Sequence, residues 1–110
     1  MVQYSSQRAG LFGALGDQTR LRIVEMLLTG DKSVGEIAAP LEISLTATLK
    51  HLRVLERAGL ASTQKTGRER RCRLQVAPLD EVDRWTREVR QAWRSRLDRL
   101  EALLAEEHGA

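Results

Sequence analysis

Residues 34–60 read VGEIAAPLEISLTATLKHLRVLERAGL, and this stretch decides the fold. Just before it, Ser33 has the spacing to Glu36 of a capping box, in which each side chain accepts a hydrogen bond from the backbone N–H of the other. The box predicts a short helix that ends at Pro40, because proline cannot continue a helix. After a tight turn, Ser44 caps a longer helix. The sequence therefore predicts a helix-turn-helix.

Two further helices precede this stretch. The first covers about residues 5–15, where two glycines each weaken the helix by up to ~1 kcal/mol relative to alanine, so it needs tertiary support. Asp17 is a good N-cap for the second helix, over residues 18–28, and Gly30 ends it. A wide apolar stripe makes the second helix typical of a central helix. The stripe comprises Leu21, Ile23, Val24, Leu27 and Leu28.

A β-hairpin and a long helix follow. Residues 61–65 and 70–76 have the pattern of two strands with a tight turn between them. The inner face of the second strand is predicted to hold Cys72, Leu74 and Val76. Pro78 then opens a helix over about residues 79–107. Its apolar positions step by three or four along roughly 40 Å, a length that one small domain cannot cover.

Length and charge limit the organisation of the chain. At 110 residues it is a single domain, mainly α with a small β-hairpin. The net charge is +3, and residues 65–73 hold five basic side chains and one acidic side chain. Such local basicity indicates a polyanionic partner.

The composition also excludes several classes of protein. Cys72 is the only cysteine, which excludes a disulfide-stapled secreted domain. Residues 1–16 lack the pattern of a signal peptide, and no apolar run reaches the roughly 18 residues that span a bilayer. We therefore expect a soluble, cytoplasmic protein. With two histidines and one cysteine, nothing places a nucleophile beside a base, so we expect no enzyme, no catalytic residues and no cofactor.

The order of the helices, the basic hairpin and the final helix resembles a winged helix-turn-helix. Residues 11–24, LFGALGDQTRLRIV, resemble the opening of the bacterial ArsR/SmtB-type repressor family, and residues 50–60, KHLRVLERAGL, resemble the end of its recognition helix. This resemblance covers roughly residues 8–78. The C-terminal pattern around Trp85 and Trp93 resembles a subgroup that lacks the usual metal ligands.

The resemblance implies a homodimeric transcriptional repressor that binds double-stranded DNA sequence-specifically. Residues 5–77 would form the DNA-binding core, with the wing at about 61–76. The helix over about 44–58 would enter the major groove, and residues 79–107 would form the dimerisation helix. Two recognition helices related by a two-fold axis predict a near-palindromic operator. The first and last helices would form the dimer interface through Leu11, Phe12, Trp85, Val89, Trp93, Leu97, Leu100 and Leu104.

Candidate DNA contacts lie at the start of the longer helix and on the wing. A helix N-terminus offers free N–H groups and a partial positive charge to phosphate. Lys50 lies one turn from Thr46 and shares its face. The candidates are Ser44, Thr46, Ala47, Lys50 and Arg53 on the helix and Arg68, Arg71 and Arg73 on the wing. The alternatives are a plain N-cap at Ser44, a solvated helix face, and protective charge on an edge strand.

Two features depart from the family pattern. Many members have glycine in the turn where this chain has Glu42. A non-glycine residue in a left-handed conformation costs about 1–2 kcal/mol, so we expect a rearranged or strained turn. Many members also have Gln and Ser where this chain has Leu45 and Leu49, at positions that tend to face bases. Leucine there could touch thymine methyl groups but cannot hydrogen-bond a base edge.

The resemblance also implies an effector that releases the DNA, usually a metal ion or arsenite. The thiolate site of the family is a pair of cysteines in the first helix of the helix-turn-helix, and residues 33–40 hold none. The other known site needs Asp-x-His followed by a distant His and Glu on the final helix, where the first histidine is His108. We therefore expect no metal site, and an effector of unknown identity stays open.

Four residues have a second interpretation. His51 is assigned a structural position supporting the recognition helix, with DNA contact or metal ligation as alternatives. Cys72 is expected to be a buried structural cysteine rather than a redox switch with a lowered pKa. The tryptophans of the last helix are assigned to core or dimer seam rather than to a small-molecule pocket. The alternative function is a winged-helix protein-interaction module without specific DNA binding, and the basic hairpin argues against it.

Overall fold

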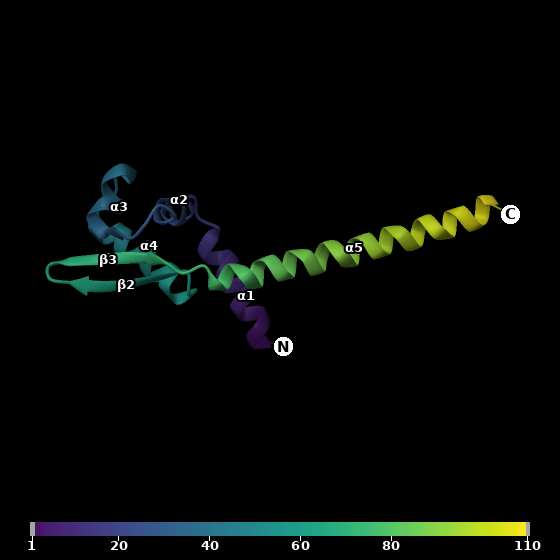
Figure 1. Ribbon diagram of the computed structural model, residues 1–110, viewed down its shortest axis with the longest axis horizontal. Helices are drawn as coiled ribbons and strands as arrows, with labels where there is room; N and C mark the ends of the chain where they lie inside the picture. Colours follow the sequence, from purple (N-terminus) through teal and green to yellow (C-terminus); the bar gives the residue numbers. More distant parts are fainter. Residues whose placement is uncertain (1, 110) are drawn as a thin grey trace. The chain divides into compact units, whose positions relative to one another are not determined.

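A computed structural model describes the backbone of residues 2–109 and the side chains of residues 7–108. The elements are α1 (Val2–Leu15), α2 (Gln18–Leu27), β1 (Lys32–Ser33), α3 (Val34–Leu41), α4 (Leu45–Arg57), β2 (Ala61–Thr66), β3 (Glu69–Leu74) and α5 (Ala77–Gly109) (Figure 1). The chain forms two compact units, Met1–Leu79 and Asp80–Ala110. The predicted mainly α architecture with a small antiparallel sheet is confirmed.

The helices begin at the capping side chains that the sequence predicted. Ser33 Oγ accepts the Glu36 N–H at 3.1 Å, and Glu36 Oε1 accepts the Ser33 N–H at 2.9 Å, which closes the capping box of α3. Asp17 and Ser44 cap α2 and α4 through one side-chain oxygen each. Such a cap satisfies an N–H group that the helix leaves free, and contributes about 0.5–2 kcal/mol.

The turn between α3 and α4 corrects one prediction and confirms another. Pro40 lies inside α3, which continues to Leu41. The proline is tolerated because it stands in the last turn, where its missing N–H removes a single helical bond. Glu42 follows with φ 55° and ψ 41°, the one non-glycine residue with positive φ in the described backbone. The strained turn expected at Glu42 is therefore present.

The end of α4 shows why a glycine follows it. Gly59 has φ +76°, and the Leu60 N–H donates to the Leu55 carbonyl at 2.8 Å while the Gly59 N–H donates to that of Glu56 at 2.9 Å. This pair of bonds is a Schellman motif, which favours glycine at the left-handed position. A Cβ on Gly59 would also lie 3.3 Å from Pro78 Cγ.

The sheet has three strands in the order β1-β3-β2, all antiparallel, where the sequence predicted only the hairpin. Cys72 on β3 faces Thr63 on one side and Lys32 on the other. β3 ends at Leu74, earlier than predicted, and Val76 is 56% exposed rather than inside. The chain leaves the sheet there, because α5 begins at Ala77.

The core lies between α1, α2, α3, α4 and the sheet. α4 contributes Thr48, Leu52 and Leu55, all fully buried. The Thr48 hydroxyl donates to the Ser44 carbonyl at 2.9 Å, so this buried polar group is satisfied. The remaining fully buried large side chains are Ile23, Ile37, Leu60 and Cys72.

The buried face of α2 is narrower than predicted. Ile23 and Leu27 are buried, whereas Leu21 is 44% and Leu28 68% exposed. At 3.6 residues per turn, Leu21 lies about 200° around the helix from Ile23. Leu28 is the C-cap, beyond the helix itself.

The second unit consists of most of α5. An exposed apolar stripe runs along this helix, with exposed fractions between 45% and 56%. It comprises Val89, Trp93, Leu97, Leu100 and Leu104. Over residues 2–109, no helix combines the length and the apolarity needed to cross a membrane.

Candidate nucleic-acid interface

The first turns of α4 present a row of exposed side chains on the side opposite its buried face. Ser44 caps the helix by accepting the Ala47 N–H at 3.0 Å. Thr46, Lys50 and Arg53 are exposed and follow one another at intervals of four and three residues. Residues at these intervals share a helix face. The structure therefore brings the candidate contacts of α4 onto one surface, next to N–H groups of the first turn that have no partner within the helix.

Two wing arginines are engaged by acids of the same unit. Arg73 donates to Asp31 Oδ2 from Nε at 3.1 Å and from Nη2 at 3.0 Å. Arg71 donates to the Asp31 carbonyl at 3.1 Å, and its Nη1 lies 3.6 Å from a carboxylate oxygen of Glu36. We call Asp31, Arg71 and Arg73 the wing tether. It fixes β3 to the loop that follows α2.

The electrostatics of the wing tether follow from this geometry. The hydrogen bond from Arg73 holds the pKa of Asp31 below its usual value, and the same bond raises the pKa of Arg73. The pKa of Glu36 is also lowered, mainly by its hydrogen bonds with Ser33 and then by the charge of Arg71. Part of the positive charge predicted to face DNA is therefore balanced within the protein. That these arginines contact DNA stays a prediction.

The wing tip adds a residue that the sequence-based candidates left out. Arg70 pairs with Lys65 across the hairpin, on the face of the sheet that holds Cys72. Its Nη1 donates to Thr63 Oγ1 at 3.2 Å. The signal was available in the sequence, since Arg70 stands two residues before Cys72 and so shares its face. Arg68 lies in the two-residue turn and is exposed, as predicted.

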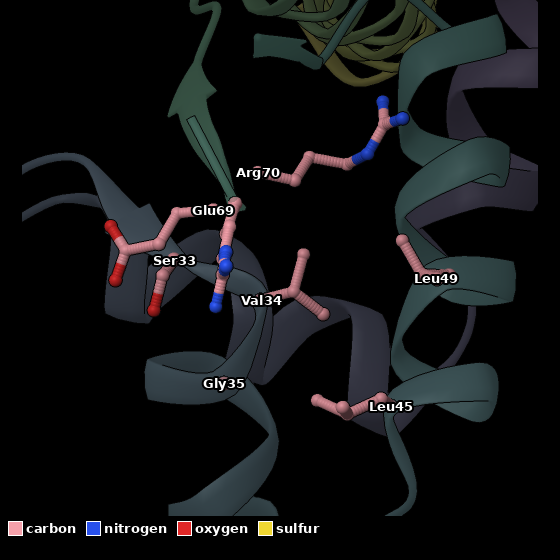
Figure 2. A pocket seen from close by; sticks show the side chains of 8 residues that line it. Ser33, Val34, Gly35, Leu45, Leu49, Glu69 and Arg70 are labelled. Carbon is pink, nitrogen blue, oxygen red and sulfur yellow. The ribbon is translucent and has the colours of Figure 1, made fainter. Parts of the chain in front are cut away.

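A hollow of about 340 Å³ lies between the wing tip, the start of α3 and the start of α4. Figure 2 shows Arg70 reaching across it from β3 toward α4, with Val34 beneath and Leu45 and Leu49 on the α4 side. Its lining residues are Ser33, Val34, Gly35, Leu45, Leu49, Arg68, Glu69 and Arg70.

His51 has the structural position predicted for it. Arg20 donates from Nε to the Ala14 carbonyl at 2.6 Å and from Nη2 to the Gly13 carbonyl at 3.1 Å. Its Nη1 lies 3.3 Å from His51 Nδ1. Because a guanidinium only donates, the ring nitrogen of His51 is the acceptor. One arginine thus joins the end of α1 to the middle of α4.

Cys72 is fully buried, in agreement with the structural role predicted for it. Burial, with a smaller contribution from the charge of Glu56, raises the pKa of its thiol to about 11. The charges of Arg70 and Arg71 lower the pKa of this thiol, but their effect is smaller than that of burial. The thiolate is the reactive form, so this environment disfavours a redox switch at Cys72.

The candidate interface residues of the terminal helices differ in exposure. Leu11 is buried in the core of its own chain, and Phe12 is 40% exposed. Trp85 is half-buried, and the candidates beyond it on α5 are exposed. Among the described side chains, no three of His, Cys, Asp and Glu gather into a group that could hold a metal ion.

Comparison with known proteins places this geometry in context. A family model described as "Bacterial regulatory protein, arsR family" matches residues 17–63. Transcriptional activator HlyU of Vibrio cholerae is 40% identical over 65 residues, which cover 59% of this chain and 60% of HlyU. The chain therefore spans about three fifths of the length of this relative.

Solved structures extend the similarity over nearly the whole chain. An ArsR-like transcriptional regulator from Rhodococcus sp. RHA1 has a TM-score of 0.87 at 32% identity, covering 96% of this chain and 97% of that one. The homodimeric winged helix-turn-helix DNA-binding domain of Mb0332 from Mycobacterium bovis has a TM-score of 0.65 at 25% identity, covering 87% and 86%.

Proposed function

Because this chain belongs to the bacterial ArsR family of winged helix-turn-helix transcriptional regulators, we propose that it is a homodimeric, sequence-specific repressor that acts on DNA in the cytoplasm. The observation that carries the proposal is the exposed face of α4 beside a basic wing tip. α4 enters the major groove through Ser44, Thr46, Ala47, Lys50 and Arg53. Arg68 and Arg70 hold the phosphate backbone beside it, and Arg71 and Arg73 exchange their acids for phosphate.

The apolar stripe of α5 supports the dimer. Fully burying a leucine or valine side chain contributes about 1.5–3 kcal/mol, and the stripe holds five large apolar residues in a row. A second copy of the same stripe is the simplest partner, since most soluble oligomers are closed and symmetric. Phe12 and Trp85 extend this proposed interface. The Mb0332 domain, which covers a similar length, is described as homodimeric.

Dimerisation sets the form of the operator. Two copies of α4 related by a two-fold axis read a near-palindrome, with half-sites about one helical turn, roughly 34–36 Å, apart. Repression follows when the occupied operator overlaps a promoter. HlyU is named an activator, and a reporter gene distinguishes activation from repression for this chain.

Fluorescence anisotropy tests the proposal. A DNA library is selected for bound fragments, and the selected duplex is titrated at two salt concentrations with unrelated DNA as competitor. We expect saturable binding that survives the competitor and weakens steeply with salt. Lys50→Ala should weaken this binding, whereas Arg22→Ala, which removes the same charge from α2, should change it little.

A reporter gene downstream of the selected operator gives the sign of regulation. Transcription should fall when the protein is expressed and recover with Lys50→Ala. Binding no tighter than to unrelated DNA would contradict the proposal. It would favour the alternative of a winged-helix module that binds another protein.

A further inference from the structure

The first two turns of α4 carry leucines on the surface that faces the hollow. Leu45 is 57% exposed, and Leu49, one turn further, is half-buried. Residues four apart share a helix face, and Figure 2 shows both on the α4 side of the hollow. Neither belongs to the buried face of α4, which consists of other residues. The core therefore does not account for this apolar pair.

The surroundings of the pair attract anions. Arg68 and Arg70 line the same hollow together with a single acid, Glu69. The carboxylate of Glu69 lies 3.5 Å from Arg71, and even without that pair the hollow holds two cations against one acid. The N-terminus of α4, which begins at Leu45, adds a partial positive charge. An apolar pair framed by cations fits a ligand that is apolar at one point and anionic around it.

Duplex DNA presents that combination in its major groove. Phosphates border the groove, and the one apolar group that base pairs display there is the C5-methyl group of thymine. Leucine offers neither donor nor acceptor, so it cannot distinguish the hydrogen-bonding edges of bases. Thr46 and Lys50 each follow one of the leucines along α4. Their side chains carry polar groups that can hydrogen-bond the base edges.

We infer that Leu45 and Leu49 are specificity-determining residues that select pyrimidines carrying a 5-methyl group, which in ordinary DNA means thymine. This inference rests on the proposed function. According to this inference, α4 recognises some bases of each half-site by apolar contact through the two leucines. It recognises the others by hydrogen bonds from Thr46 and Lys50.

Replacing thymine with deoxyuridine tests the inference, because the replacement removes only the methyl group and keeps base pairing. Each thymine of the selected operator is replaced in turn, and the Kd for the unaltered protein is measured by anisotropy. We expect one or two positions per half-site at which the replacement weakens binding by about fourfold, the equivalent of one buried methyl-sized group, and by about fifteenfold when both half-sites are altered.

Variants assign the effect to the two leucines. Leu45→Ala and Leu49→Ala should each bind the thymine and uracil operators with nearly equal affinity at the position they contact. Leu28→Ala is the matched control, since Leu28 is 68% exposed but lies at the end of α2. It should keep the full preference for thymine. Thermal unfolding of each variant checks that the fold is intact, and the measurements on the unaltered protein do not depend on the variants.

The outcomes separate this inference from the proposed function. Specific binding that is indifferent to every uracil replacement would overturn the inference and leave the DNA-binding regulator standing. So would a preference for thymine that both alanine variants retain. Failure to bind any selected duplex specifically would overturn both.

Discussion

At the scale of single residues, the backbone of this fold is strained at one non-glycine position. Glu42 holds a left-handed conformation at the turn of the helix-turn-helix. Its carboxylate is exposed, so the strain is not offset by burial. This residue ends α3, so its backbone conformation sets the direction in which the chain continues toward α4.

Replacing Glu42 with glycine should stabilise the protein. Relief of about 1–2 kcal/mol of backbone strain is partly offset by about 0.4–1 kcal/mol of extra entropy in the unfolded chain. The net gain of about 0.5–1 kcal/mol should raise the midpoint of urea unfolding without changing its slope. Gly67→Ala is the converse control: at φ +64° and with no atom within 4 Å of the added Cβ, it should destabilise through conformation alone.

Cys72 predicts a dependence of stability on alkaline pH. Its pKa is about 11 in the folded protein and 9.0 in the absence of that environment, so the folded state holds the proton more tightly. The resulting stabilisation is complete below pH 9 and is lost as the pH rises toward 11. Urea midpoints measured between pH 8 and pH 11 should fall less steeply for Cys72→Ala than for the unaltered protein. Equal slopes would contradict this.

At the scale of elements, local signals were predictable from the sequence and distant partnerships were not. The caps Asp17, Ser33 and Ser44 act within three residues of themselves, so the sequence was sufficient to predict them. β1 has two residues, too few to show a period. Its existence depends on β3, which is some forty positions away along the chain.

In the candidate site, too, local features could be predicted from the sequence and contacts between distant residues could not. Helical spacing was enough to place Thr46 and Lys50 on one face of α4. The partners of Arg71 and Arg73 could not be predicted, because Asp31 precedes them by 40 and 42 positions. The hollow was not predictable either, since its lining comes from three segments that only the tertiary fold brings together.

The wing tether leads to a prediction about affinity. In the proposed complex Arg73 exchanges Asp31 for a phosphate, so Asp31→Asn removes the carboxylate that competes with that phosphate. The Kd for the selected operator should therefore fall at every salt concentration, while the slope of log affinity against log salt concentration, which counts the phosphates neutralised, should change little. Glu25→Gln, which removes an exposed acid from α2, is the control and should leave the Kd nearly unchanged. An unchanged Kd for Asp31→Asn would place Arg73 away from the backbone.

The contribution of the wing tether to the stability of the fold depends on pH. The pKa of Asp31 is lowered from 3.8 by the hydrogen bond from Arg73, so the bond stabilises the fold above that value. As the pH falls through the lowered pKa, the carboxylate is protonated and the contribution is lost. Neutral pH therefore leaves the tether fully formed in the protein without DNA.

At the scale of the whole molecule, the proposed dimer depends on the apolar stripe of α5. Leu97→Glu introduces a charge into the apolar stripe, where a partner helix would bury it without a counter-ion. We expect a monomer by sedimentation equilibrium, together with a marked loss of affinity for the two-half-site operator. Gln91→Glu adds the same charge away from the stripe and should remain dimeric. A dimer of unchanged mass with Leu97→Glu would place the interface elsewhere.

The fork that Arg20 forms between α1 and α4 has an evolutionary consequence. Two of its three acceptors, the carbonyls of Gly13 and Ala14, belong to the backbone and persist whatever the side chains become. Of the groups that hydrogen-bond Arg20, only His51 contributes a side chain, and the carboxylate of Asp17 lies farther away, at 3.8 Å. Across descendants of this gene the two positions should change together: lineages that lose the arginine are released from keeping an acceptor at position 51, while lineages that keep it are not.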